Sequence, residues 1–87
     1  MGRTFLLGGK TVNGVWIEIG ERVREKRREK RYTHKDMGDF LNLSAFAYRR
    51  REEGKRCFSI DQILTMCAMF SVNPGWLLTG KGENDDQ

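Results

Sequence analysis

Closely spaced helix start and stop signals constrain the fold of this chain more than any other feature. Ser44 is typical of a helix N-cap and Gly54 of the residue that ends a helix, which leaves about ten residues of helix between them. Similar signals recur along the chain: capping boxes at Thr33 and Ser59, a left-handed stop at Asn42, a helix start at Asn73-Pro74 and a stop at Gly80. The spacing predicts an all-α domain of short helices.

Apolar side chains at helical spacing locate five helices between these signals. The first is expected to begin near residues 17–20 and to run to about residue 30, with Ile19, Val23 and Arg27 on one face. The second covers about 34–41, and the third lies between Asn42 and Gly54. The fourth is the most apolar segment and is the expected core helix, and the fifth follows Pro74.

Particular apolar residues are expected to pack these helices together. They are Met37, Phe40 and Leu41 in the second helix, Ile60, Ile63, Leu64, Cys67, Ala68, Met69 and Phe70 in the fourth, and Trp76, Leu77 and Leu78 in the fifth. Gly38 lies inside the second helix at a cost of roughly 1 kcal/mol against alanine. That glycine makes sense where another backbone approaches closely.

The two ends of the chain differ from the helical part. Residues 1–16 are rich in glycine, and Asn13-Gly14 between β-prone residues predicts a two-residue hairpin turn, with a frayed N-terminus as the alternative. Residues 81–87 are polar and acidic, which favours a disordered tail. We therefore expect an N-terminal extension at 1–16, one domain at 17–80 and a tail at 81–87.

Positive charge is concentrated in the first two-thirds of the chain. Residues 1–60 hold 15 Lys or Arg and 8 Asp or Glu, a net charge of +7, whereas residues 61–87 carry −3. Arg49, Arg50 and Arg51 follow one another in the third predicted helix, and three consecutive arginines are not typical of a core helix. A polyanionic partner is the natural interpretation. The interleaved charges at 24–31 are typical of a solvated surface instead.

Several classes of protein receive no support from the sequence. No apolar run approaches the roughly 20 residues that span a bilayer, and no signal peptide is present, so we expect a cytoplasmic protein without a membrane partner. One histidine and two cysteines, Cys57 and Cys67, cannot complete a zinc site or a nucleophile–base set. We expect reduced thiols, no metal, no cofactor and no enzymatic activity.

The order of helices and the residues at their joints resemble the Cro/phage-repressor-type helix-turn-helix family (lambda repressor-like, Xre-type). The resemblance extends from about residue 19 to 83. It is carried by Ile19-Gly20-Glu21-Arg22-Val23-Arg24, by Arg27, by Glu52-Glu53-Gly54-Lys55-Arg56 and by residues 70–80. It implies a five-helix DNA-binding domain, to which a short N-terminal strand or hairpin would be added.

The resemblance implies roles at matched positions. Arg27 and Glu52 match a buried salt bridge between the first and third helices, and Tyr48 an inward-facing position. Base edges would be read by Ala45, Phe46, Arg49 and Arg50, and phosphates would be contacted by His34, Lys35, Ser44, Lys55 and Arg56.

Five positions in or next to the third predicted helix have features of their own. Arg50 suits a bidentate contact to guanine, and Ala45 and Phe46 suit thymine methyl groups. Phe46 packed against the N-terminal segment or a dimer partner is the alternative. Arg51 and Glu53 depart from the family pattern, and an acid at residue 53 would repel the phosphate backbone.

The function implied is a sequence-specific transcriptional regulator, expected to be a phage or bacterial repressor. It would bind double-stranded DNA as a homodimer at a (pseudo)palindromic operator, in a bacterial cytoplasm or in that of a phage host. The alternative is an antitoxin or adaptor that binds a partner protein through residues 1–16 and uses the same domain for autoregulation.

Overall fold

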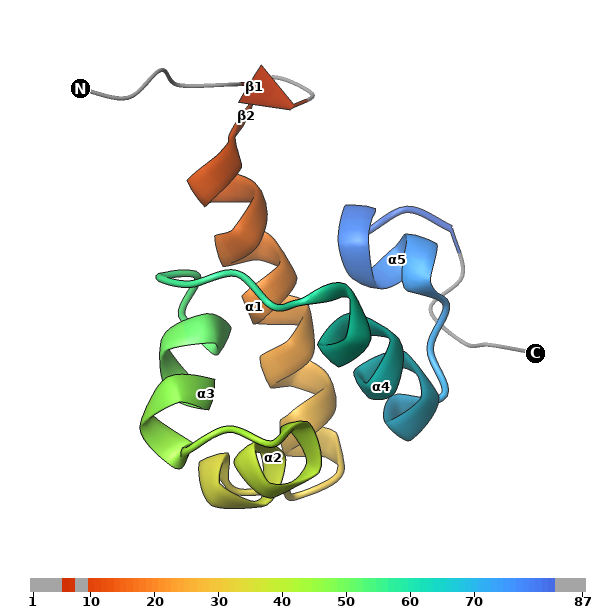
Figure 1. Ribbon diagram of the computed structural model, residues 1–87. Coiled ribbons are helices and arrows are strands. Elements are labelled where there is room, and N and C mark those ends of the chain that lie inside the picture. Colours follow the sequence, from red (N-terminus) through yellow and green to blue (C-terminus); the bar gives the residue numbers. More distant parts are fainter. Residues whose placement is uncertain (1–5, 8–9, 83–87) are drawn as a thin grey trace.

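Five helices account for most of the chain that the structure describes, as the spacing of the caps predicts (Figure 1). The computed structural model describes residues 6–7 and 10–82. In chain order the elements are β1 (Leu6–Leu7), β2 (Lys10–Thr11), α1 (Val12–Glu29), α2 (His34–Leu41), α3 (Ala45–Glu52), α4 (Ile60–Phe70) and α5 (Pro74–Thr79). The expected architecture of five helices is confirmed.

Side-chain caps set the starts of the later helices. The Thr33 hydroxyl accepts from the backbone N–H of Asp36, whose carboxylate accepts from the Thr33 N–H in return, at 3.0 and 2.9 Å. Ser59 and Gln62 form the same reciprocal pair at the start of α4. Both predicted capping boxes are confirmed. They could be predicted because short-range hydrogen bonds of this kind depend only on local sequence.

Left-handed residues end these helices where the sequence predicts. Asn42 closes α2 with φ 61°, and Gly80 closes α5 with φ 76°. Gly54 follows α3 with φ 80°, a conformation that costs glycine little because it has no Cβ. The segment 42–44 is therefore a tight turn that turns the chain sharply from α2 into α3.

Helix α1 begins earlier than the sequence indicates, and this changes the N-terminal prediction. The expected start at 17–20 is wrong, because α1 begins at Val12 and includes Asn13 and Gly14. The Asn-Gly pair is thus helical and is not a hairpin turn. Val15 and Trp16 are half-buried against the core, and the Trp16 ring lies 6.4 Å from that of Phe58. This packing offsets the weak local helix propensity of the segment.

A strand pair precedes α1, but at a different place from the predicted hairpin. Strands β1 and β2 are antiparallel, with Leu6 opposite Thr11 and Leu7 opposite Lys10. The intervening residues 8–9 lie outside the described residues, as do 1–5 and 83–87, which include most of the predicted tail. Helix α1 runs through the boundary expected at residue 16.

The core collects one face from each of the helices. Its fully buried members include Val23, Met37, Tyr48, Met66 and Leu77, which come from α1, α2, α3, α4 and α5 respectively. Together with the neighbouring residues they form one cluster.

Not every apolar residue expected in the core is buried there. Helix α4 turns Ile63, Met66, Cys67 and Phe70 inward, while Ile60 in its first turn and Leu64 on its other face are exposed. Phe40 of α2 and Leu78 of α5 are also exposed, and Ala68 lies on the surface. A continuous apolar stretch does not show which of its residues face inward, so these expectations were wrong.

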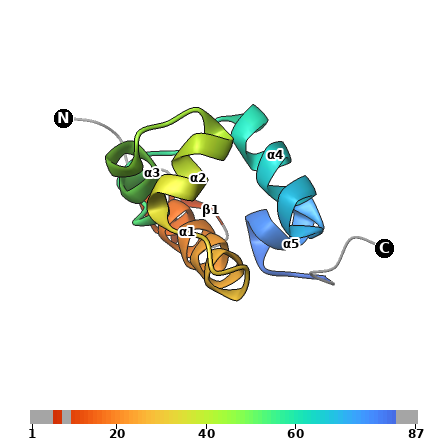
Figure 2. The same cartoon turned by 90° about the horizontal axis from the view of Figure 1, so that it is seen from below.

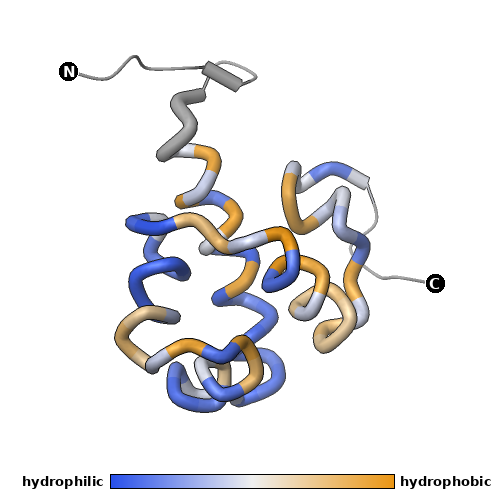
Figure 3. The backbone as a smooth tube through the Cα atoms, in the orientation of Figure 1, coloured by the Kyte–Doolittle hydropathy of each residue, from blue (hydrophilic) through white to orange (hydrophobic). Residues whose placement is uncertain are grey.

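Helix α1 is the axis around which the other helices are arranged. Helix α2 lies at the C-terminal end of α1, and α3 and the α4–α5 pair lie on opposite sides of it (Figures 1 and 2). The Arg22 guanidinium of α1 donates to the Leu77 carbonyl of α5 at 2.7 Å. Figure 3 shows α3 as hydrophilic in its C-terminal half and α4 as largely hydrophobic. The basic helix therefore lies at one side of the domain.

Candidate nucleic-acid interface

The close approach of α2 and α3 depends on Gly38. A Cβ at this position would overlap the Leu43 carbonyl oxygen and would lie 3.2 Å from the Ser44 carbonyl oxygen. The expectation that another backbone approaches Gly38 is confirmed, although the backbone belongs to the turn between the helices. Because glycine permits this contact, the turn fixes the position of α3 against α2.

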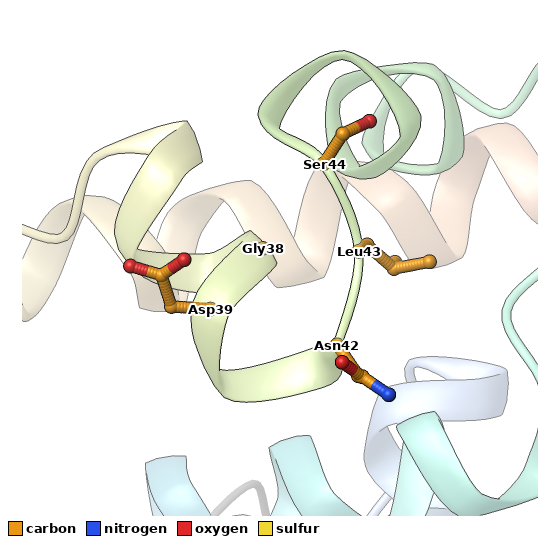
Figure 4. Close-up of a pocket in the computed structure, with 5 residues that line it drawn as sticks. All are labelled: Gly38, Asp39, Asn42, Leu43 and Ser44. Carbon is orange, nitrogen blue, oxygen red and sulfur yellow. The ribbon is translucent and has the colours of Figure 1, made fainter.

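The same turn forms an open depression of about 370 Å³ lined by Gly38, Asp39, Asn42, Leu43 and Ser44. Figure 4 shows the side chains of Asp39 and Asn42 pointing in different directions. The depression therefore reflects the shape of the turn and not a converging set of ligands.

Helix α3 is fastened to the rest of the domain by its inner face. Tyr48 and Glu52 are its two buried residues. At the far end of the helix, Gly20 of α1 lies so close to Glu52 that a Cβ on Gly20 would overlap the Glu52 carbonyl oxygen. The depth and direction of α3 are thus set against α1 by one polar cluster and one backbone contact.

The centre of that cluster is the carboxylate of Glu52, a residue whose side chain is only 2% exposed. The structure brings Arg27 and Glu52 together: Arg27 Nε donates to Oε2 at 2.7 Å and Nη2 to Oε1 at 3.1 Å. Tyr48 donates its hydroxyl to Oε2, and Arg24 Nε donates to Oε1 at 3.4 Å. Arg27 also donates to the Tyr32 carbonyl at 2.9 Å. This network joins α1, α3 and the segment that leads into α2.

Burial and hydrogen bonding both shift the pKa values of this cluster, and for Glu52 they act in opposite directions. Burial raises the pKa of Glu52, but the hydrogen bonds from Arg27 and Tyr48 and the charge of Arg27 outweigh it, so the pKa lies below its usual range. Burial and the bond to Glu52 raise the pKa of Tyr48 well above its usual value. The hydrogen bond to Glu52 likewise raises the pKa of Arg27. Glu52 is therefore ionised at neutral pH, and Tyr48 remains a donor.

His34 lies at the edge of this cluster. Its Nε2 is 3.6 Å from Glu52 Oε1, its ring centroid is 5.9 Å from that of Tyr48, and 38% of its side chain is exposed. The predicted phosphate role requires a donor that faces solvent. One ring nitrogen is directed at Glu52, so only the other is left for an external group.

The outer face of α3 carries the four predicted base-reading residues. Ala45, Phe46 and Arg49 are exposed, and Arg50 is half-buried. The Arg49 and Arg50 guanidiniums lie 5.6 and 5.8 Å from the centroid of the Phe46 ring. The structure therefore places all four residues on one helix, with the guanidiniums of Arg49 and Arg50 both near the Phe46 ring.

The five predicted phosphate-contacting residues are more dispersed. Lys35 and Lys55 are exposed but paired with acids: Lys35 Nζ lies 3.0 Å from Asp39 Oδ2, and Lys55 Nζ lies 3.4 Å from Glu53 Oε1. Arg56 is exposed, and the Ser44 hydroxyl caps α3 by accepting from the Ala47 N–H at 3.0 Å. The placement of Glu53 beside Lys55 gives that acid a local partner.

Two arginines have roles that the sequence alone did not indicate. Arg24 joins the Glu52 cluster, and its spacing of three residues from Arg27 is a signal that could have indicated it. Arg51 turns back along its own helix, where Nη1 donates to the Ala47 carbonyl at 2.9 Å. Arg51 is thereby held against α3.

Among residues 6–7 and 10–82 the structure shows no metal-ligand cluster, disulfide or membrane-spanning helix. No three His, Cys, Asp or Glu side chains in this part of the chain are grouped as metal ligands. Cys57 is exposed and Cys67 is buried, and no disulfide joins them. None of the described helices has the length and apolar character needed to cross a membrane.

The turn-linked α2–α3 pair within five helices defines the fold class, a five-helix fold of the lambda repressor-like helix-turn-helix type. No protein-family model and no curated protein matches the chain. Among solved structures, the chain is similar to the P22 c2 repressor protein, crystallised in complex with synthetic operator 9T in the presence of Tl⁺. The likeness has a TM-score of 0.66 at 22% sequence identity and covers 72% of this chain and 96% of that one. The chain thus has the fold of a phage repressor domain.

Proposed function

We propose that this protein is a sequence-specific regulator that binds double-stranded DNA and represses transcription. The observation that carries the proposal is the division of α3 into two faces. Tyr48 and Glu52 hold the inner face, whereas Phe46, Arg49 and Arg50 gather on the outer one. A short, rigidly held helix with exposed arginines suits the major groove of B-form DNA, where guanine presents two acceptors to one guanidinium.

The remaining polar residues would set the register on the phosphates. Lys55 and Arg56 follow α3, while His34 and Lys35 begin α2, so cations border both ends of the two-helix unit. On DNA, Lys55 would exchange its contact with Glu53 for a phosphate. The N-terminal amides of α3 beside Ser44 add a partial positive charge.

The protein would act as a homodimer on an operator with two half-sites about one helical turn apart, roughly 34 Å. Its site of action would be the cytoplasm of a bacterium, or of the host if a phage encodes it. The similarity in fold to an operator-bound repressor supports this proposal.

The proposal is tested by selecting duplex sites from a random pool and comparing variants on the selected site. Arg50→Ala should reduce the free energy of binding to the selected site by about 1–3 kcal/mol and relax the base preference at one position per half-site. Lys55→Ala should weaken all sequences alike and lower the slope of log K against log salt by about one. Lys81→Ala, which removes an exposed cation after α5, is the matched control. Arg50→Ala and Lys55→Ala variants that bind like the wild type would show that α3 does not dock as proposed.

A second candidate is an antitoxin or adaptor that binds a partner protein through the N-terminal segment. The observation in its favour is the position of the β1–β2 pair at the end of α1 opposite to α2 (Figure 1). Deletion of residues 1–11 separates the two candidates and leaves α1 intact. Loss of a co-purifying protein with DNA binding unchanged would favour the adaptor, and loss of dimerisation would make the segment a dimer arm.

A further inference from the structure

Phe46 is a large apolar residue of α3 whose presence is not explained by packing in the core. The residue is 61% exposed, and the core of the domain contains Tyr48 from the same helix instead. A large apolar ring gains little from burial at such a position. Its contacts lie on the surface, where the guanidiniums of Arg49 and Arg50 approach it from the following turn.

Spacing along the helix explains why the three side chains meet. Residues three and four positions apart are neighbours on a helix surface, so Phe46 can contact both Arg49 and Arg50. Both guanidiniums lie within the roughly 6 Å over which an aromatic ring attracts a cation. Arg49 has a second contact at 3.9 Å with Glu53, so it is held from two sides.

This arrangement bears on the cost of binding. Arginine carries about 2 kcal/mol of rotamer entropy, much of which is lost when its guanidinium is fixed on a base. A ring that already restricts the guanidinium reduces that loss, which is the general advantage of preorganisation.

We propose that Phe46 is a positioning residue that holds Arg49 and Arg50 in the orientation needed to recognise guanine in the operator. The inference rests on the proposed function, because it takes double-stranded DNA as the ligand. It differs from direct reading of a thymine methyl group by the ring, since its effect appears at guanine positions. Phe46 then acts through the arginines, and its aromatic character matters more than its size.

The first test measures the position of the arginines without DNA. In the free protein, the ring current of Phe46 should shift the side-chain NMR resonances of Arg49 and Arg50. The shifts should persist in Phe46→Trp and vanish in Phe46→Leu. Phe40→Leu is the matched control, because Phe40 is also exposed but packs on Tyr32 in an edge-on geometry at 5.0 Å. Arginine shifts that do not change in Phe46→Leu would overturn the proposal.

The second test measures discrimination on a duplex selected by the wild-type protein from a random pool. Phe46→Leu should reduce the preference for guanine over adenine at the selected guanine positions by roughly 2- to 5-fold for each arginine affected. Phe46→Trp should retain the preference for guanine over adenine. The thermal midpoint of unfolding should stay unchanged in both variants. A merely structural role would move the thermal midpoint and would not depend on aromaticity.

The outcomes separate the two levels of the argument. Full guanine preference in Phe46→Leu, with loss only at a thymine position, would overturn positioning in favour of direct reading by the ring. A wild-type protein that shows the ring-current shifts but selects no sequence would overturn the proposed function, and not the placement of the guanidiniums by Phe46.

Discussion

Replacing Glu52 with glutamine is the perturbation for which the structure predicts the largest effect. The substitution keeps the shape of the side chain but removes its charge and turns one of its two acceptor oxygens into a donor. Arg27, whose side chain is 11% exposed, then loses its charged partner, and the new NH₂ group faces donors already directed at it. Tyr48 would also lose the acceptor of its hydroxyl if that oxygen is the one replaced.

The magnitude follows from the burial of the pair. Breaking a buried ion pair by removing one partner costs about 3–5 kcal/mol, because the remaining charge stays buried without compensation. A chain of 87 residues has a total stability of about 4–13 kcal/mol, so the loss is a large share of it. The midpoint of thermal unfolding should fall by at least about 12 °C.

The assay is urea unfolding followed by far-ultraviolet circular dichroism, with two further variants as controls. Arg24→Gln removes only the 3.4 Å contact of a side chain that is 39% exposed, so it should cost less than about 1 kcal/mol. The double variant Arg27→Met with Glu52→Leu should be more stable than Glu52→Gln, because it leaves no buried charge unpaired and the side chain of Arg24 is 39% exposed to solvent. If the free energy of unfolding of Glu52→Gln lies within about 1 kcal/mol of the wild-type value, Glu52 does not hold α3 in place.

Three further predictions concern pH and the backbone. Folding lowers the pKa of Glu52, so the contribution of Glu52 to the free energy of unfolding is present above its usual pKa of 4.5 and is lost as pH falls through the lower folded pKa. The difference in stability between the wild type and Glu52→Gln, measured by urea unfolding, should therefore narrow on acidification. A difference that stays constant would contradict this role of Glu52. Gly20→Ala should destabilise by about 1–3 kcal/mol in the same assay, because its Cβ overlaps the Glu52 carbonyl oxygen, and a neutral result would show that α1 and α3 can separate freely. Ser71→Gly should raise the thermal midpoint and add about 0.5–1 kcal/mol, since Ser71 has a left-handed φ of 54°; no gain would show that the conformation costs serine little.

Local signals predicted the helices from α2 onward, because caps act over three or four residues. The hydroxyl of Ser59 and the amide of Gln62 are close in sequence, so their pairing needs no tertiary information. The start of α1 could not be predicted in this way. Asn13-Gly14 favours a turn locally, and only the packing of Val15 and Trp16 against the core makes the segment helical.

The same distinction applies to the candidate site. The position of α3 between Asn42 and Gly54 follows from the sequence, and so does the presence of arginines on it. The convergence of Arg24 and His34 on Glu52 does not, because it brings together parts of the chain 28 and 18 residues apart, respectively. The stacking of two arginines on Phe46 follows helical spacing, but its geometry depends on rotamers that a sequence does not specify.

Under the proposed function, the two faces of α3 also determine how freely this protein can change its DNA target. The side chains that fasten the helix, Tyr48 and Glu52, are not those that face outward, so substitutions at the exposed residues Ala45, Phe46 and Arg49 remove little buried contact, and those at the half-buried Arg50 leave both fastening residues in place. Stability therefore places few limits on those positions, and descendants could acquire new operators without compensating changes elsewhere. A library that randomises these outward positions should contain mostly folded members, from which altered sequence preferences can be selected directly.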